Sequence, residues 1–246
     1  MHLWRFLLPS ALGFTVRNAG HALVDKVTGA PARTLQAAEY VSRHAHRGDP
    51  EDVLRALDRF AIEKRWLMSV GPEKGPLIEE LAGRLPRDAH VLELGAYCGY
   101  SSILIAKSLG PDSKVLSVEI NADAVASARA NVEVAGLSEQ ITFLHGPSTD
   151  IIRQLDGTFD LVFLDHWKDL YTTDLQLIEK RRLIKCGSIV VADNVGEIFS
   201  PHDYLNYVRN SGRYHSENRA GTIEYTSLPD ALEISEYTPQ PDRPAH

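Results

Sequence analysis

Residues 92–101 read Leu-Glu-Leu-Gly-Ala-Tyr-Cys-Gly-Tyr-Ser. An apolar run at 90–94 ends at Gly95, and a helical pattern begins after Gly99. Glycine at both positions lets the backbone turn tightly and approach a ligand without a β-carbon in the way. The dinucleotide fingerprint G-x-G-x-x-G is absent here. The E-x-G-x-x-x-G spacing instead suits a cofactor without a pyrophosphate, although a glycine turn after a strand also occurs for structural reasons alone.

Short apolar runs and helical patterns alternate along the rest of the chain. Continuous Val, Ile and Leu runs separated by helices are typical of a parallel sheet buried on both faces. We expect strands at 90–94, 114–119, 140–145, 160–165 and 188–193, and helices at 100–109, 122–135, 149–155 and 170–183. A helix at 201–211 and strands at 213–218, 222–227 and 231–237 follow. The predicted fold class is α/β: a doubly wound, mostly parallel central sheet with an antiparallel C-terminal finish.

Extra helices are expected before the first strand, at 34–46, 50–64 and 71–85. Thr34 is a candidate N-cap for the first of them, and Asp49 caps the second with Pro50 at its first position. No internal repeat or low-complexity linker interrupts the chain. The simplest organisation is therefore a single domain at 34–239, with an N-terminal extension at 1–33 and a short disordered tail at 240–246.

Composition excludes several classes of function. The chain has 246 residues and a net charge of −7, so as a whole it repels nucleic acid and anionic membranes. Its two cysteines, Cys98 and Cys186, stand at unrelated spacing, which argues against a disulfide framework or a zinc ribbon and fits a reducing compartment. We expect a cytoplasmic protein with a small-molecule substrate, as a monomer or a homodimer.

The first 33 residues differ from the rest in charge. They hold four basic residues against one acidic residue, a local +3 that leaves −10 for the remainder. The apolar stretch 3–16 is broken by Arg5 and Pro9 and falls short of the roughly 20 residues that span a bilayer. A secretory signal is an alternative, but its basic start would be weak. The extension either lies on a membrane surface as an interfacial helix, in weak contact, or packs on the domain or a second subunit.

A carboxylate at the end of the second strand supports a cofactor site. Glu119 ends the run 114–119 and lies 24 residues after Gly95. An acid at this place can accept hydrogen bonds from both hydroxyls of a ribose; the alternative is a solvated acid at a strand end. The glycine turn and the acid together predict an adenosine-bearing cofactor such as S-adenosylmethionine.

Two later strands end in metal-binding residue types. The runs 160–165 and 188–193 end in Asp165 and Asp193, and Asn194 follows. In an open α/β sheet the carboxyl ends of the strands form one crevice, so these side chains should converge. A few oxygen ligands, with room for water and substrate, suit Mg²⁺, whereas the histidine or thiolate sets of zinc or iron are not evident.

Lys168 is the basic residue of these turns, three positions after Asp165. A divalent cation nearby disfavours its charged form, so the neutral amine becomes available as a base. A phenol coordinated to Mg²⁺ gives up its proton more easily than a free one, so the two form a matched pair. His166, next to Asp165, is expected to pack or hydrogen-bond rather than to bind metal.

The chain resembles the catechol O-methyltransferase family. The resemblance rests on WLMSVG at 66–71, LELGAYCGYS at 92–101, SVEIN at 117–121, FLDHWKD at 163–169, ADNV at 192–195 and IEY at 223–225. These motifs cover about residues 35–239 in the family's order and near its spacing. FLDHWKD followed by ADN is the most specific part. The fold implied is the Rossmann-like methyltransferase domain of class I, S-adenosylmethionine-dependent enzymes.

The resemblance also implies roles for individual residues. Catalytic roles fall to Lys168 as general base and to Glu224, which would accept a hydrogen bond from the second catechol hydroxyl. The implied Mg²⁺ ligands are Asp165, Asp193 and Asn194. The implied cofactor-binding residues are Met68, Val70, Glu93, Gly95, Tyr97, Ser101, Glu119, Ile120, Ser148, Asp165 and His166. The implied substrate-binding residues are Trp66, Met68, Trp167, Lys168, Asn194 and Glu224.

The chain departs from the family pattern where a substrate side chain would lie. The loop 195–201 is one residue longer than usual, Ile198 stands near the place of an expected proline, and Ile223 replaces a leucine. The substrate is therefore left at the breadth of a catechol-type small molecule. The alternatives are a metal-dependent O-methyltransferase acting on phenylpropanoids, flavonoids or bacterial metabolites, and a binding relative without turnover.

Overall fold

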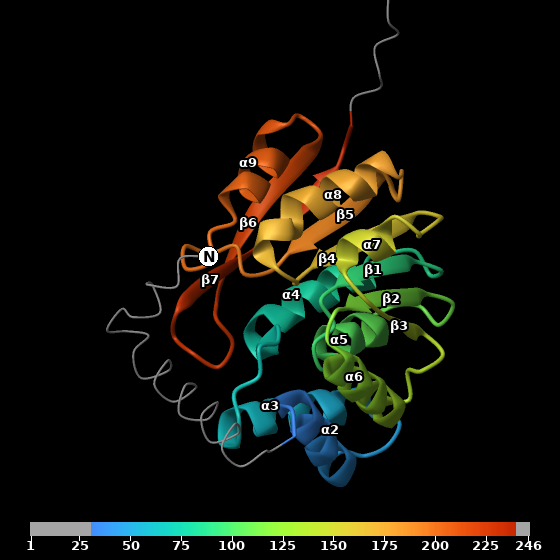
Figure 1. Ribbon diagram of the computed structural model, residues 1–246, viewed down its shortest axis with the longest axis vertical. Helices are drawn as coiled ribbons and strands as arrows, with labels where there is room; N and C mark the ends of the chain where they lie inside the picture. Colours follow the sequence, from blue (N-terminus) through green and yellow to red (C-terminus); the bar gives the residue numbers. More distant parts are fainter. Residues whose placement is uncertain (1–30, 240–246) are drawn as a thin grey trace, which may run out of the picture.

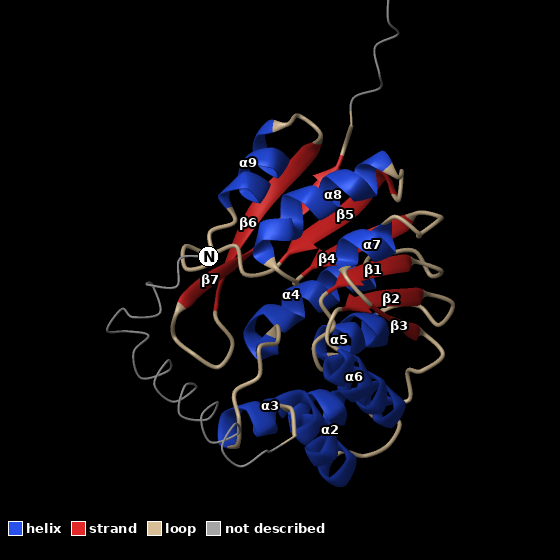
Figure 2. Ribbon diagram, viewed as in Figure 1, coloured by secondary structure: helices blue, strands red, loops and turns tan. Residues whose placement is uncertain are grey.

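The computed structural model describes residues 31–239. The predicted segments 1–33 and 240–246 thus lie outside the described part, apart from residues 31–33. A single seven-stranded sheet runs through the described residues in the order β3-β2-β1-β4-β5-β7-β6 (Figure 2). Its strands are β1 His90–Leu94, β2 Lys114–Glu119, β3 Ile141–His145, β4 Phe159–Leu164, β5 Ile184–Ala192, β6 Tyr214–Thr222 and β7 Pro229–Tyr237. The first five are parallel, and β7 pairs antiparallel with both β5 and β6, so the predicted α/β fold class is confirmed.

Helices cover both faces of this sheet (Figure 1). They are α2 Arg33–His44, α3 Pro50–Glu63, α4 Gly71–Gly83, α5 Tyr100–Ser108, α6 Ala122–Ala135, α7 Ser148–Ile152, α8 Tyr171–Lys180 and α9 His202–Asn210, with a short 3₁₀ turn, η2, at Lys168–Leu170. Val91 and Val191 pack on the face covered by α2 to α6, whereas their neighbours Leu92 and Val190 pack under α7, α8 and α9. Side chains alternate across a strand, so apolar runs without polar breaks fill both cores.

The parallel register brings four strand ends to one edge. Leu94 of β1 lies opposite Val118 of β2 and Leu164 of β4, and Leu164 lies opposite Ala192 of β5. The residues that follow these positions therefore emerge side by side at the carboxyl edge of the sheet. This edge is where ligands bind in open α/β folds.

Three local predictions were wrong. Thr34 lies inside α2, whose N-cap is Ala32, so it caps nothing. The expected strands 213–218 and 222–227 are one strand, β6, which ends at Thr222 and is followed by a turn. The fifth strand begins at Ile184 rather than Ser188. The predicted cap of α3 is confirmed, since Asp49 accepts a hydrogen bond from the backbone N–H of Asp52 at 3.0 Å.

Within residues 31–239, every helix is too short or too polar to cross a bilayer.

Candidate functional site

Gly95 forms the turn after β1, and its conformation leaves no room for a side chain. Its φ is +104°, and a β-carbon there would lie 2.6 Å from the carbonyl oxygen of Asp165. The Gly95 N–H donates to Val118 O at 2.8 Å, and the Asp165 N–H donates to Leu94 O at 2.9 Å. The hydrogen bonds of the sheet thus continue into both turns, and they hold the turn after β1 in contact with the end of β4.

Glu119 closes the next turn in the expected place. Its carboxylate accepts hydrogen bonds from the backbone N–H of Tyr97 at 2.9 Å and of Asn121 at 2.8 Å. Tyr97 itself has a φ of +46°, an uncommon value for a residue with a side chain. Ile120 beside it is 68% exposed. The β1 and β2 turns are therefore joined through the carboxylate of Glu119.

Glu93 lies deep under the same turn. It is fully buried, and the hydroxyls of Ser102 and Ser117 donate to its Oε2. Burial raises the pKa of Glu93, against the opposing hydrogen bonds from serine. Among the described residues its Oε1 has no partner. Ser101, expected in the same site, is buried at the start of α5.

A buried aspartate lies beside two of the predicted cofactor-binding residues, Ser148 and His166. Asp174 of α8 accepts hydrogen bonds from Ser148 Oγ at 2.5 Å, Thr149 Oγ1 at 2.6 Å and His166 Nε2 at 2.9 Å. Although burial acts in the opposite direction, these hydrogen bonds lower the pKa of Asp174. Burial lowers the pKa of His166, which keeps the imidazole neutral. His166 is thus placed as a hydrogen-bonding residue, as the sequence predicts.

Three buried carboxylates, those of Asp165, Asp193 and Glu224, lie close together at the carboxyl ends of β4 and β5. Burial, with Asp165 nearby, raises the pKa of Asp193 to about 6. Burial, with Asp193 and Asp165 nearby, raises the pKa of Glu224 to about 8. Burial also raises the pKa of Asp165. In the described structure Asp193 Oδ2 and Glu224 Oε2 lack a hydrogen-bond partner.

Lys168 lies at this cluster, where the sequence predicts it. Its Nζ is 3.1 Å from Asp165 Oδ1 and donates to the carbonyl oxygen of His166 at 3.2 Å. The same ammonium lies 5.4 Å from the ring centre of Tyr171 and 5.8 Å from that of Phe199, within range of a cation–π attraction.

Sequence reasoning missed a second lysine. Lys74 of α4 is buried and forms ion pairs with Asp193 and, at 2.8 Å, with Asp230. Burial alone would lower its pKa, but the charges of Asp193, Asp230 and Glu224 raise it. Tyr171 was also missed; its hydroxyl donates to the backbone oxygen of Asp193 at 3.1 Å. No local sequence signal marks either contact, because the partners come from distant segments.

The donor set fits a magnesium ion. It consists of oxygen atoms only, from two carboxylates and the amide of Asn194, which is the chemistry that Mg²⁺ prefers. The unpartnered oxygen of Asp193 is the atom that a cation would satisfy. Within residues 31–239 there is no group of three or more His, Cys, Asp or Glu side chains arranged as a metal cage. Such a cage is not required, since Mg²⁺ keeps water and substrate oxygens among its ligands.

Apolar side chains lie beside Glu224. Trp66 donates from Nε1 to the carbonyl oxygen of Glu224 at 3.1 Å and packs on a small cluster of Ile198, Ile223 and Leu228. A β-carbon on Gly71 would lie 2.9 Å from Glu224 Cβ, so the start of α4 directly abuts this residue.

The remaining predicted wall and cofactor residues differ in exposure. Met68 and Trp167 are 50% and 59% exposed, whereas Val70 is buried. Trp167 donates from Nε1 to Asp169 Oδ2 at 3.1 Å. Met68 and Trp167 therefore expose apolar side chains at the surface.

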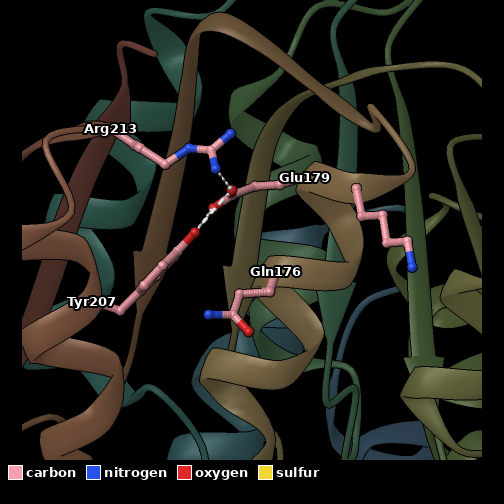
Figure 3. Close-up of a pocket in the computed structure, with 5 residues that line it drawn as sticks. Gln176, Glu179, Tyr207 and Arg213 are labelled. Carbon is pink, nitrogen blue, oxygen red and sulfur yellow. Dashed lines mark hydrogen bonds and ion pairs between the residues drawn. The ribbon is translucent and has the colours of Figure 1, made fainter. Parts of the chain in front are cut away.

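A separate pocket of about 300 Å³ lies between α8, α9 and the start of β6 (Figure 3). Its central acid, Glu179, accepts hydrogen bonds from Tyr207 at 2.9 Å and Tyr214 at 2.6 Å and pairs with Arg213 at 3.3 Å. These contacts give the Glu179 carboxylate its hydrogen-bond partners and link α8 to α9 and the start of β6. The pocket is lined by other residues than those of the carboxylate cluster.

Comparisons with known proteins agree with this geometry. Residues 44–205 match the model of the O-methyltransferase family. The bovine catechol O-methyltransferase is 40% identical over 200 residues, which cover 79% of this chain and 73% of that protein. The zebrafish catechol O-methyltransferase B is 39% identical over 250 residues, covering 95% and 92%. The crystal structure of an O-methyltransferase from Bacillus cereus in complex with SAH shares the fold, with a TM-score of 0.65 at 20% identity and coverage of 90% and 98%. The chain therefore belongs to the O-methyltransferase family, as an S-adenosylmethionine-dependent enzyme similar to the catechol O-methyltransferases.

Proposed function

We propose that this enzyme transfers a methyl group to one hydroxyl of a catechol-type small molecule in a Mg²⁺-dependent reaction. One observation carries the proposal: Asp165, Asp193 and Glu224 converge at one buried place, and Lys168 bonds to the first of them. The identity of about 40% to catechol O-methyltransferases supports the same chemistry.

Asp165, Asp193 and Asn194 would hold the metal. The chemistry supplied at this place would be Lewis-acid activation of a substrate hydroxyl, and a site open to more than one oxygen would favour catechols over lone phenols. Burial raises the pKa values of Asp165 and Asp193, and a cation is the natural partner for two buried carboxylates.

Lys168 would act as the general base. It would take the proton of the reacting hydroxyl, so that the phenolate oxygen forms a bond to the methyl carbon while the bond from that carbon to the sulfonium breaks. The products are a methyl ether and S-adenosylhomocysteine, with the proton left on Lys168. Before this step Lys168 has to exchange its contact with Asp165 for one with the substrate, since its Nζ is 3.1 Å from Asp165 Oδ1.

Glu224 would hold the second hydroxyl. Its Oε2 lacks a partner in the described structure although the side chain is buried, so a hydroxyl donor would relieve it. Trp66, Met68 and Trp167 would form the apolar walls around the ring and the methyl group. Because the step consumes a cation and an anion, most of the catalysis would come from positioning in a site shielded from water.

The proposed cofactor site lies along the β1 and β2 turns. Glu119 would accept the ribose hydroxyls, while the remaining proposed contacts are Met68, Val70, Glu93, Gly95, Tyr97, Ser101, Ile120, Ser148, Asp165 and His166. Each carboxylate oxygen of Glu119 already accepts a hydrogen bond from one backbone N–H group. Each oxygen keeps a second lone pair that can accept a hydrogen bond from a ligand.

The test is a methyl-transfer assay of the purified protein on a panel of catechols, single phenols, phenylpropanoid thioesters and flavonoids. We expect turnover of vicinal diols, its loss in EDTA and its return on adding Mg²⁺. Turnover that is indifferent to EDTA would overturn the metal assignment. Preference for a single phenol would overturn the catechol assignment. Because the 195–201 loop is lengthened, the most informative comparison is among catechols that differ in the substituent on the ring.

A further inference from the structure

Two buried residues outside the proposed ligand set bond directly to it. The side chains of Lys74 and Asp230 are 2% and 0% exposed, and Lys74 Nζ lies 2.8 Å from Asp230 Oδ2. Lys74 also pairs with Asp193 Oδ1. A β-carbon on Gly221 would lie 3.0 Å from Lys74 Cγ, so the glycine in β6 makes room for the lysine stem.

Asp230 determines which way the amide of Asn194 points. Asn194 Nδ2 donates to Asp230 Oδ2 at 2.9 Å. Because an ionised carboxylate only accepts hydrogen bonds, the amide must turn its nitrogen towards Asp230 and its oxygen away from it. Asp230 is held in turn, since its Oδ1 accepts the backbone N–H of Gly196 at 3.1 Å. A β-carbon on Gly196 would lie 2.6 Å from Asp230 Cα, so the two segments are in direct contact.

Asp193 is oriented in a similar way. Its Oδ1 receives Lys74 and, at 2.6 Å, the backbone N–H of Asn194. Its Oδ2 has no hydrogen-bond partner among residues 31–239. One oxygen is therefore fixed by the protein, and the other is left for a ligand.

We propose that Asp230 is a positioning residue for the metal site: it orients the amide of Asn194 directly and the carboxylate of Asp193 through Lys74. This inference rests on the proposed metal site. Partners in the layer behind metal ligands set the ligands' orientation, and their loss typically weakens metal affinity about 10–100-fold. Asp230 comes from β7, 36 residues after Asn194 in sequence, so this role would depend on the antiparallel end of the sheet.

The test measures the binding of Mn²⁺, as a probe for Mg²⁺, by electron paramagnetic resonance without substrate. Asp230→Ala removes every acceptor and should weaken Mn²⁺ binding about 10–100-fold. Asp230→Asn keeps the volume and one carbonyl acceptor, so it should fold and show a smaller loss. Glu233→Gln is the matched control. It changes another buried acid of β7, which pairs with Arg209 instead of the metal ligands, and should leave Mn²⁺ affinity unchanged.

Thermal unfolding of each variant separates positioning from stability. If Glu233→Gln weakens Mn²⁺ binding as much as the Asp230 variants do, the effect is a general loss of stability and the proposal is overturned. If both Asp230 variants bind Mn²⁺ within twofold of the wild type, Asp230 does not position the ligands, although the metal site itself stands. A wild-type protein that binds no Mn²⁺, or an Asn194→Ala variant that binds it normally, overturns the proposed metal site and this inference with it.

Discussion

The hydroxyl of Tyr225 donates a hydrogen bond to Asp58 Oδ1 at 2.7 Å. This contact connects the turn after β6, which carries Glu224, to helix α3, which carries Asp58. Ser69 Oγ lies 3.2 Å from the same hydroxyl, so the segment before α4 joins the link. Tyr225 has a φ of +58°, a strained value that the surrounding contacts have to maintain.

Tyr225→Phe should therefore affect the substrate side of the site. Loss of the hydroxyl should lower the free energy of unfolding by about 1 kcal/mol, because the partly buried carboxylate of Asp58 keeps only the longer hydrogen bond from Tyr100. Because Glu224 lies next to Tyr225, kcat/KM for a catechol should fall about tenfold through misplacement. Kinetics and urea unfolding check both effects.

The matched control for that change is Tyr207→Phe. It removes a hydroxyl that bonds Glu179 at 2.9 Å in the pocket of Figure 3, away from the carboxylate cluster. This variant should lose similar stability and keep the kcat/KM of the wild type. Equal changes in kcat/KM for both variants would show that Tyr225 has no specific link to the site.

Asp58 should give stability a measurable pH dependence. Burial raises its pKa above the ordinary 3.8, although hydrogen bonds from Tyr225 and Tyr100 oppose this and Arg59 is nearby. Between the unfolded and the folded pKa the folded chain binds more protons at this group, so its contribution to stability falls as pH rises.

Asp58→Asn removes that titration while keeping an acceptor for Tyr225. The variant should match the wild type near pH 3.5 and become progressively more stable than it towards pH 7, as measured by urea unfolding at each pH. A stability difference that is flat or slopes the other way would show that burial does not dominate at Asp58.

Lys168→Met should abolish most turnover while leaving cofactor affinity intact. A positioned general base typically contributes about 10²–10⁴-fold to the rate, and Met keeps the length of the stem without the amine. Single-turnover methyl transfer measures the first effect, and calorimetric titration with S-adenosylhomocysteine measures the second. The control is Lys185→Met, whose lysine pairs with Asp160 at 2.7 Å, at the opposite end of the sheet. Turnover close to that of the wild type would remove Lys168 as the base.

The features that the sequence predicts correctly share a physical cause. Asp165 and Asp193 follow apolar parallel strands, and parallel strands end at one edge, so a local pattern was enough to place them together. Lys74 has no such signal. It stands 119 residues from Asp193 near the start of a helix, where a lysine normally faces water.

The mistaken strands have a different origin. β6 is an edge strand whose middle residues are exposed, so Glu217 to Ala220 show no apolar alternation that would reveal a continuous strand. Backbone pairing with β7 holds it together over its whole length, from Tyr214 opposite Tyr237 to Thr222 opposite Pro229. Pairing of this kind depends on a partner strand and leaves little trace in the pattern of the exposed segment.

A comparison of Gly95→Ala with Gly157→Ala should separate the cost of backbone strain from the cost of close packing in the turn after β1. Gly95 and Gly157 both have positive φ, +104° and +88°, so alanine carries a conformational cost at either position, of order 1–3 kcal/mol. At Gly157 a β-carbon would meet nothing within 4 Å, whereas at Gly95 it would lie 2.6 Å from the backbone oxygen of Asp165. Gly95→Ala should therefore cost more unfolding free energy than Gly157→Ala, displace the Asp165 turn and weaken both S-adenosylhomocysteine and Mn²⁺ binding. Gly157→Ala should lose stability alone. Calorimetric titrations and urea unfolding of the pair measure each quantity, and equal losses of ligand affinity would show that the contact between the two turns does not shape the site.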